Sequence, residues 1–183
     1  MKPKCIIFLV LLAFLWGMPH KAAAQFFAVR ADALAALTGT LHLGAEASVA
    51  DKWTIEASGY WNPVRTSNLT MNFGAVQIGP RYWLYEAFVG HFLGVQLSWV
   101  GYDLGRRTRR YDGSAYGFGV SYGYAWMLSK RWNIAVEAGV GLFHTKDTRR
   151  DPTVSDWEDE YIYHTRRWTL LPSRLEVSFS YLF

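Results

Sequence analysis

The chain has 183 residues, a net charge of +4, one cysteine and 17% aromatic residues, which suits one domain and excludes an internal disulfide framework. Three of its 19 basic residues, Lys2, Lys4 and Lys21, lie near the N-terminus, and the other 16 nearly balance 15 acidic residues. This nearly neutral body argues against nucleic-acid binding.

The first segment has the order of a secretory signal peptide. Lys2 and Lys4 precede an unbroken apolar run at 6–16, Pro19 ends it, and residues 22–24 are Ala-Ala-Ala. The alternative is a membrane-spanning helix, but eleven residues reach only about 16 Å, against a hydrocarbon core of about 30 Å. We predict a signal peptide at 1–24, which removes Cys5 on cleavage, and a single mature domain at 25–183.

The mature region alternates apolar and small or polar residues with a period of two, which predicts strands. No window of eighteen apolar residues is present, and most strands have the roughly 9–11 residues that cross a membrane at a tilt. The eight predicted strands are 26–36, 41–49, 53–62, 73–85, 91–103, 114–128, 131–144 and 171–183.

The connections alternate in length. Short turns are expected at 50–52, 86–90 and 129–130, and longer connections at 63–72, 104–113 and 145–170, with a shorter first one at 37–40. Outer-membrane barrels have short periplasmic turns and longer external loops. The sequence therefore predicts an all-β fold, an eight-stranded antiparallel up-and-down transmembrane barrel with both termini on the periplasmic side.

The alternating faces distinguish a membrane barrel from a soluble, ligand-carrying one. One face of 114–128 carries Tyr116, Phe118, Tyr122, Tyr124 and Trp126, which is too bulky for an eight-stranded lumen and suits lipid contact. The opposite faces of the strands carry mid-strand polar and charged residues, which we expect to point inward. These residues are Arg30, Asp32, His42, Glu46, Glu56, Gln77, Arg81, Gln96, Glu137, Arg174 and Glu176.

We expect these lumen charges to pair, because an unpaired buried charge costs several kcal/mol. Arg30, Arg81 and Arg174 would pair with the acids, since a planar guanidinium can hold two carboxylate oxygens. Surplus acids would be met by glutamine, by Tyr60, by water or by His42, which we expect to bond to a carboxylate. Such a network would plug the barrel and make it rigid, so the sequence predicts a closed lumen without a catalytic role.

The last strand carries aromatic residues at alternate positions, Phe179, Tyr181 and the terminal Phe183. This pattern resembles the closing-strand signal that the outer-membrane barrel assembly machinery reads. We therefore expect that machinery to be a partner of the chain.

Several short segments across the chain carry a family resemblance. They are Thr38-Gly39-Thr40-Leu41-His42-Leu43-Gly44, Lys52-Trp53, Trp61-Asn62-Pro63, Arg81-Tyr82-Trp83, Gly90-His91-Phe92-Leu93-Gly94, Gly119-Val120-Ser121-Tyr122-Gly123-Tyr124 and Leu128-Ser129-Lys130-Arg131-Trp132-Asn133. These segments resemble a family of small Gram-negative, Bacteroides-type outer-membrane barrels that is catalogued as a domain of unknown function. The resemblance implies an eight-stranded barrel, frequent coding near fimbria-like surface proteins, and no assigned catalytic residues. The long connection 145–170 departs from the family pattern.

The sequence has no phosphate-binding loop, metal-ligand cluster or nucleophile elbow, so we expect no cofactor. The leading interpretation is a non-enzymatic protein of a Gram-negative outer membrane, structural or surface-interacting, in contact with membrane lipid and lipopolysaccharide and with a fimbria-like partner. The alternative is a lipid-modifying enzyme that uses the rim histidine His144, with Ser155 as the nearest loop serine.

A basic run, Arg106, Arg107, Arg109 and Arg110, falls in the third external connection. It has two interpretations. It could bind lipopolysaccharide or the acidic patch of a partner, or it could be a solvated hairpin tip whose charge prevents self-association.

Overall fold

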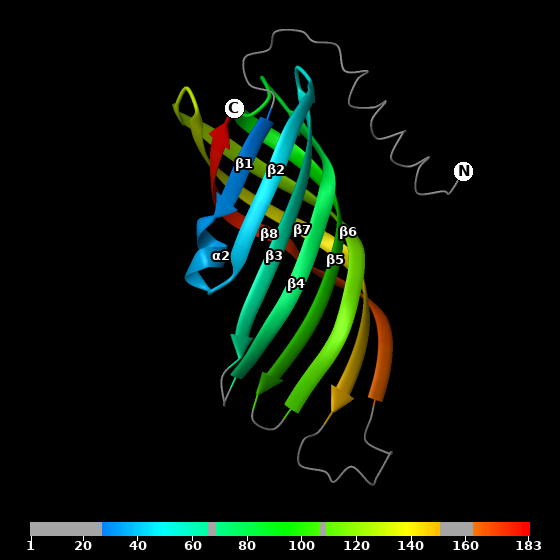
Figure 1. Cartoon of the computed structure of the whole chain (residues 1–183). Coiled ribbons are helices and arrows are strands. Elements are labelled where there is room, and N and C mark those ends of the chain that lie inside the picture. The colour runs from blue at the N-terminus through cyan, green and yellow to red at the C-terminus, as the bar shows by residue number, and fades with distance from the viewer. Residues whose placement is uncertain (1–26, 66–68, 107–108, 151–162) are drawn as a thin grey trace, which may run out of the picture.

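The computed structural model describes residues 27–65, 69–106, 109–150 and 163–183, and its strands close into one antiparallel barrel in chain order (Figure 1). The prediction of an eight-stranded, up-and-down barrel is confirmed. The elements are β1 (Phe27–Asp32), α2 (Ala33–Leu37), β2 (Leu41–Ala50), β3 (Trp53–Arg65), β4 (Leu69–Trp83), β5 (Gly90–Arg106), β6 (Arg109–Ser129), β7 (Trp132–Arg150) and β8 (Tyr163–Leu182).

The hairpins at one end of the barrel are longer than predicted. β7 continues to Arg150 and β8 begins at Tyr163, so much of the predicted connection 145–170 is paired strand. β5 and β6 likewise extend into the predicted connection 104–113. The prediction stopped where apolar alternation stopped, but strand pairing continues through polar residues because it depends on backbone hydrogen bonds.

The predicted first strand, 26–36, is wrong in its second half. β1 ends at Asp32, and the one-turn helix α2 follows. The Asp32 carboxylate accepts from the Leu34 N–H at 2.9 Å and caps this helix. Its sequence, ALAAL, has high helix propensity, and a capping aspartate before it outweighs the expected alternation. No helix in the described part of the chain is long and apolar enough to cross a membrane.

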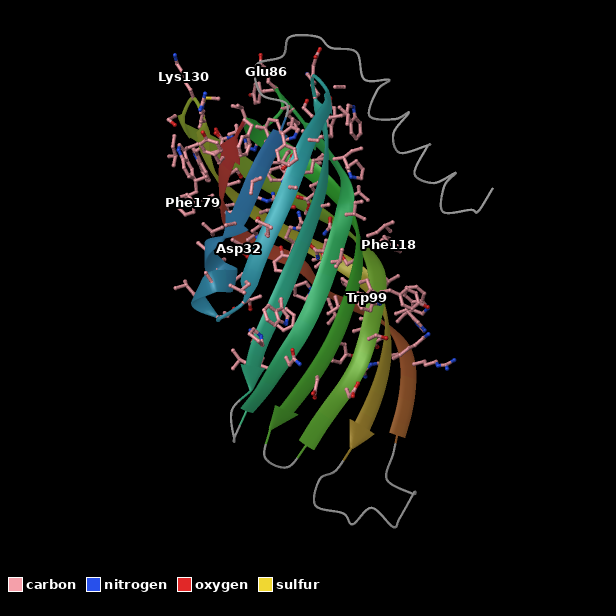
Figure 2. All side chains as sticks on the ribbon, in the orientation of Figure 1. Asp32, Glu86, Trp99, Phe118, Lys130 and Phe179 are labelled. Carbon is pink, nitrogen blue, oxygen red and sulfur yellow. The ribbon has the colours of Figure 1, made fainter. Side chains whose placement is uncertain are left out.

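The barrel has a polar inside and an apolar outside. Alternation places charged and amide side chains in the lumen, where Arg81, Glu56 and Gln96 are each 2% exposed. Large apolar side chains cover the outer face, including Trp99 and Phe118, which project away from the barrel (Figure 2).

The two ends of the barrel differ. The turns that contain Glu86 and Lys130 lie at the same end as the start of β1 and the end of β8, and we call this the terminal end (Figures 1 and 2). The hairpins β3–β4, β5–β6 and β7–β8 point to the opposite end, which we call the loop end. An apolar cluster fills the lumen at the terminal end and includes Trp83, Phe88, Phe92 and Leu182.

The wall of the barrel is incomplete toward the loop end. β1 pairs with β8 only from Ala28↔Leu182 to Asp32↔Ser178, after which the chain turns into α2. The rest of β8 pairs with no strand but β7 among the described residues, although α2 lies against β8 where β1 ends. At the loop end β3 and β8 lie at opposite margins of the sheet (Figure 1).

Candidate functional site

Three arginines meet four glutamates in the middle of the lumen. Arg30 comes from β1, Arg81 from β4 and Arg174 from β8, so the cluster joins strands that are far apart in the chain. The glutamates come from β2, β3, β7 and β8, and all seven side chains are at most 5% exposed. We call Arg30, Arg81, Arg174, Glu46, Glu56, Glu137 and Glu176 the charge layer.

Glu56 and Glu137 are central to the charge layer, because each forms salt bridges with all three arginines. Glu56 makes the closer set of contacts. Its Oε2 lies 2.8 Å from Nη2 of Arg81 and also pairs with Arg30, and its Oε1 pairs with Arg174. Arg81 reaches Glu46 at 2.8 Å through Nη1 and pairs with Glu137 through Nη2. Each guanidinium is thus shared between carboxylates, which offsets the cost of burying the charges.

Arg174 connects the charge layer to the amides on its loop-end side. It donates to Oε1 of Gln77 at 2.7 and 3.2 Å and to Oε1 of Glu137 at 3.1 Å. Gln77 in turn donates to the Ser173 carbonyl at 3.0 Å, and Gln96 donates to Oγ of Ser173 at 2.9 Å. The polar plug therefore continues as a layer of glutamine and serine.

On the terminal-end side, the charge layer is anchored to the apolar cluster. The Trp83 indole donates to the Thr54 hydroxyl at 2.9 Å, and that hydroxyl donates to Oε1 of Glu46 at 2.5 Å. The Arg81 guanidinium lies over the Phe92 ring, 4.7 Å from its centroid. Gly123 makes room for that ring, since a Cβ there would lie 2.3 Å from Phe92 Cζ. The apolar cluster and the charge layer are therefore in direct contact, with no gap between them along the lumen.

Two residues predicted for the network do not bond to its charged groups. Asp32 is buried, but its Oδ1 accepts from the backbone N–H groups of Leu34 and Val177 and not from an arginine. His42 lies against the Tyr60 ring at 4.3 Å, and neither ring nitrogen has a hydrogen-bond partner among the described residues. The expected bond from His42 to a carboxylate is thus wrong there, and Tyr60 itself donates to Glu176 at 3.3 Å.

Sequence reasoning missed Phe88, which lies in a turn outside the alternating pattern. Its φ is 71°, which is unusual for a residue with a side chain, and it is 4% exposed. The Asn133 side chain donates to its carbonyl at 2.5 Å. This turn places Phe88 across the terminal end of the lumen, so the connection itself closes that end.

The other predicted site residues lie outside the charge layer. Phe179 is on the outer face of β8, Phe183 follows the strand's last residue and is exposed, and Tyr181 packs edge-on against Trp132 and Phe183. Arg107 and Ser155 lie outside the described residues. Only the backbone is described for Arg106, Arg109 and Arg110, and Arg106 and Arg109 face each other in the β5–β6 ladder.

His144 is also on the outer face, between the rings of Tyr116 and Trp168 at 5.2 and 5.1 Å. Within the described residues, no group of three or more histidines, cysteines or acids could hold a metal ion.

Similarity to known proteins identifies the family. The family model described as "Protein of unknown function (DUF3575)" matches residues 7–183, almost the whole chain. The chain belongs to this family. Neither a curated protein nor a solved structure matches the chain. The sequence resemblance to a family of unknown function is confirmed at this level, whereas the Bacteroides-type origin and the fimbria-like gene context remain predictions.

Proposed function

We propose that this DUF3575 protein is a non-enzymatic β-barrel of a Gram-negative outer membrane, with a sealed lumen and a structural or surface-interaction role. The outer face carries the argument. The outer face has one aromatic girdle near the terminal end, which includes Trp126 of β6 and Trp53 of β3, and a second near the loop end, which includes Tyr116 and Trp61. Exposed apolar side chains form a band between the two girdles. No Asp, Glu, Lys or Arg points outward between these girdles on β3, β5, β6 or β7.

The height of this band supports the proposal. Trp126 and Tyr116 are ten residues apart, which is about 33 Å along a strand and about 25 Å along the axis of a barrel with a tilt near 40°. That height is typical of the lipid-facing band of outer-membrane barrels. Charged residues such as Lys146 and Arg166 return on the loop-end side of the girdle formed by Tyr116, His144 and Trp168. Because outer-membrane barrels have short periplasmic turns and longer external loops, we orient the barrel with its loop end toward the cell exterior.

Two single-cysteine variants test insertion and orientation together. Lys146→Cys places a thiol on the exposed loop-end side, and Lys130→Cys places one in a terminal-end turn, each in a Cys5→Ser background. We expect a membrane-impermeant maleimide to label Lys146→Cys on intact cells, and Lys130→Cys only after permeabilisation. Equal labelling of both variants would contradict the orientation, and a soluble periplasmic protein without heat-modifiable gel mobility would contradict the membrane proposal.

The role at the surface is tested with the same pair of variants. The resemblance implies fimbria-like neighbours, and the strands that extend beyond the girdle offer Lys146 and Arg166 to such a partner. Cross-linking on intact cells through Lys146→Cys should capture a surface protein that Lys130→Cys does not. A lipid A mass profile that changes when the protein is present, and reverts in His144→Ala, would instead favour the enzyme.

A further inference from the structure

The lumen is not filled throughout. On the loop-end side of the glutamine layer lies a cavity of about 560 Å³, within the range of small-molecule sites. Its wall is mostly apolar and includes Phe73, Val100, Ala115, Phe143 and Leu171. The predicted plug therefore occupies the lumen from the terminal end to the glutamine layer, and the lumen on the loop-end side has room for a ligand.

The floor of the cavity offers no free charge. Arg174 lies there, but it is 5% exposed and its donors are directed at Glu56, Glu137 and Gln77. Other polar groups of the lining are also satisfied, since the Tyr60 hydroxyl donates to Glu176 and the Thr145 hydroxyl donates to the Arg167 carbonyl. A charged head would gain little at this floor, so the deep part of the cavity suits an apolar chain.

The cavity reaches around the edge of β8. Its lining includes every residue from Leu171 to Leu175, and thus both inward-facing and outward-facing side chains of one strand. A bulge beside Ser173 shifts the register with β7, and β1 no longer pairs with β8 beyond Ser178. Leu175 is 69% exposed on the outer apolar face. The cavity is therefore continuous with the surface that we assign to lipid.

Positive charge lies at the outer rim of the same region. Arg167 lines the cavity, Arg166 is exposed next to it, and Lys146 is paired with Arg166 in the β7–β8 ladder. These cations are one or two residues beyond the girdle formed by Tyr116, His144 and Trp168. A phosphate or carboxylate head at this level would meet them while its chain points into the lumen.

We propose that the cavity binds one acyl chain of an anionic membrane amphiphile, which enters sideways past the edge of β8 that β1 leaves unpaired. The apolar wall holds the chain, and the rim cations Lys146, Arg166 and Arg167 hold the head. The same chemistry is offered by a free fatty acid, an anionic phospholipid and lipid A. This inference rests on the proposed membrane location, because the side opening needs lipid outside it.

Native mass spectrometry of the mature barrel tests the proposal. The barrel is refolded in detergent with palmitate, phosphatidylglycerol or lipid A, and its folding is checked by heat-modifiable mobility. We expect at least one amphiphile to remain bound at one copy per barrel, and the amphiphile that remains identifies the source. A barrel that folds but retains none of the three overturns the inference, whereas a mature chain that fails to insert into lipid vesicles in a parallel experiment contradicts the proposed function instead.

Matched variants locate the bound chain. Ala115→Trp and Val100→Trp fill the cavity from its wall, and Val95→Trp adds a tryptophan on the outer face of β5, away from β8. We expect each cavity variant that folds to lose at least tenfold in retention, with Val95→Trp close to the wild type. Equal retention in all three would place the amphiphile on the outer surface and would overturn the proposal.

Discussion

Arg81 shows how strongly one side chain supports the lumen. It contacts three carboxylates, and Arg81→Met would leave four glutamates facing two arginines. Loss of one partner from a buried ion pair costs about 3–5 kcal/mol. We therefore expect Arg81→Met to lower the free energy of unfolding by about that amount, measured by urea titration in lipid vesicles, while the protein still reaches the membrane.

The matched control is Arg131→Met in an exposed turn, where the guanidinium donates to the Tyr181 hydroxyl at 3.1 Å. Surface substitutions usually change stability by less than about 0.5 kcal/mol. If Arg81→Met cost no more than Arg131→Met, the charge layer would not be a source of stability.

Phe88 is the residue that the sequence could not assign, since a turn has no alternation to show which way a side chain points. Its ring packs on Trp83 at 6.0 Å and closes the terminal end. Phe88→Ala should cost about 3–5 kcal/mol, as for other buried phenylalanines. Tyr85→Ala in the same turn is the comparison, because Tyr85 is 67% exposed and should cost much less. Similar unfolding midpoints for the two variants would argue against a packed plug.

At the scale of elements, strand number, order and inward-facing charges could be predicted because alternation and turn lengths are local in the sequence. The ends of the strands could not, because backbone pairing continues without an apolar pattern. The bulge at Ser173 was also invisible: it places Arg174 and Leu171 both toward the lumen, so simple parity fails beyond it. The cavity depends on this bulge and on the early end of β1, and it was therefore not predicted.

Asp32 joins two elements through one carboxylate. It caps α2 through the Leu34 N–H and accepts from the Val177 N–H of β8 at 3.2 Å, where strand pairing with β1 stops. Asp32→Ala should cost about 1–2 kcal/mol for the cap and more for the second bond. Asp32→Asn keeps an oxygen acceptor and should retain most of the stability. Equal losses in thermal melts of the two variants would show that the charge matters, and not the capping geometry.

The end of β8 separates assembly from stability. Phe183 is 64% exposed and contacts Phe27 and Tyr181 at the barrel surface. If the assembly machinery reads this residue, Phe183→Ser should reduce the folded barrel in the outer membrane severalfold, yet change urea stability after refolding in vitro by only about 1 kcal/mol. Immunoblots of heat-modifiable protein give the first quantity. Unchanged levels in cells would remove Phe183 from the assembly signal.

The whole molecule has a layered lumen. From the terminal end, an apolar cluster around Trp83 and Phe92 is followed by the charge layer, then by Gln77 and Gln96, and finally by the open cavity. The first three layers are cross-linked by side chains from opposite walls, whereas the cavity lies where the wall itself is incomplete. Rigidity and binding capacity are therefore separated along the barrel axis, with the rigid part nearer the termini.

This arrangement predicts that the barrel does not conduct ions, although its outer end is open. An eight-stranded barrel has an interior that side chains can just fill, and an ion would have to break several buried ion pairs and displace Phe88 and Phe92. Planar-bilayer recordings of the purified wild type should show no steady conductance, with a general porin as the positive control. Phe88→Ala should also stay closed, because the charge layer remains intact behind the vacated mouth. Reproducible single-channel steps from the wild type would show that the layers do not seal the lumen, and steps from Phe88→Ala alone would assign the seal to that ring and not to the arginines.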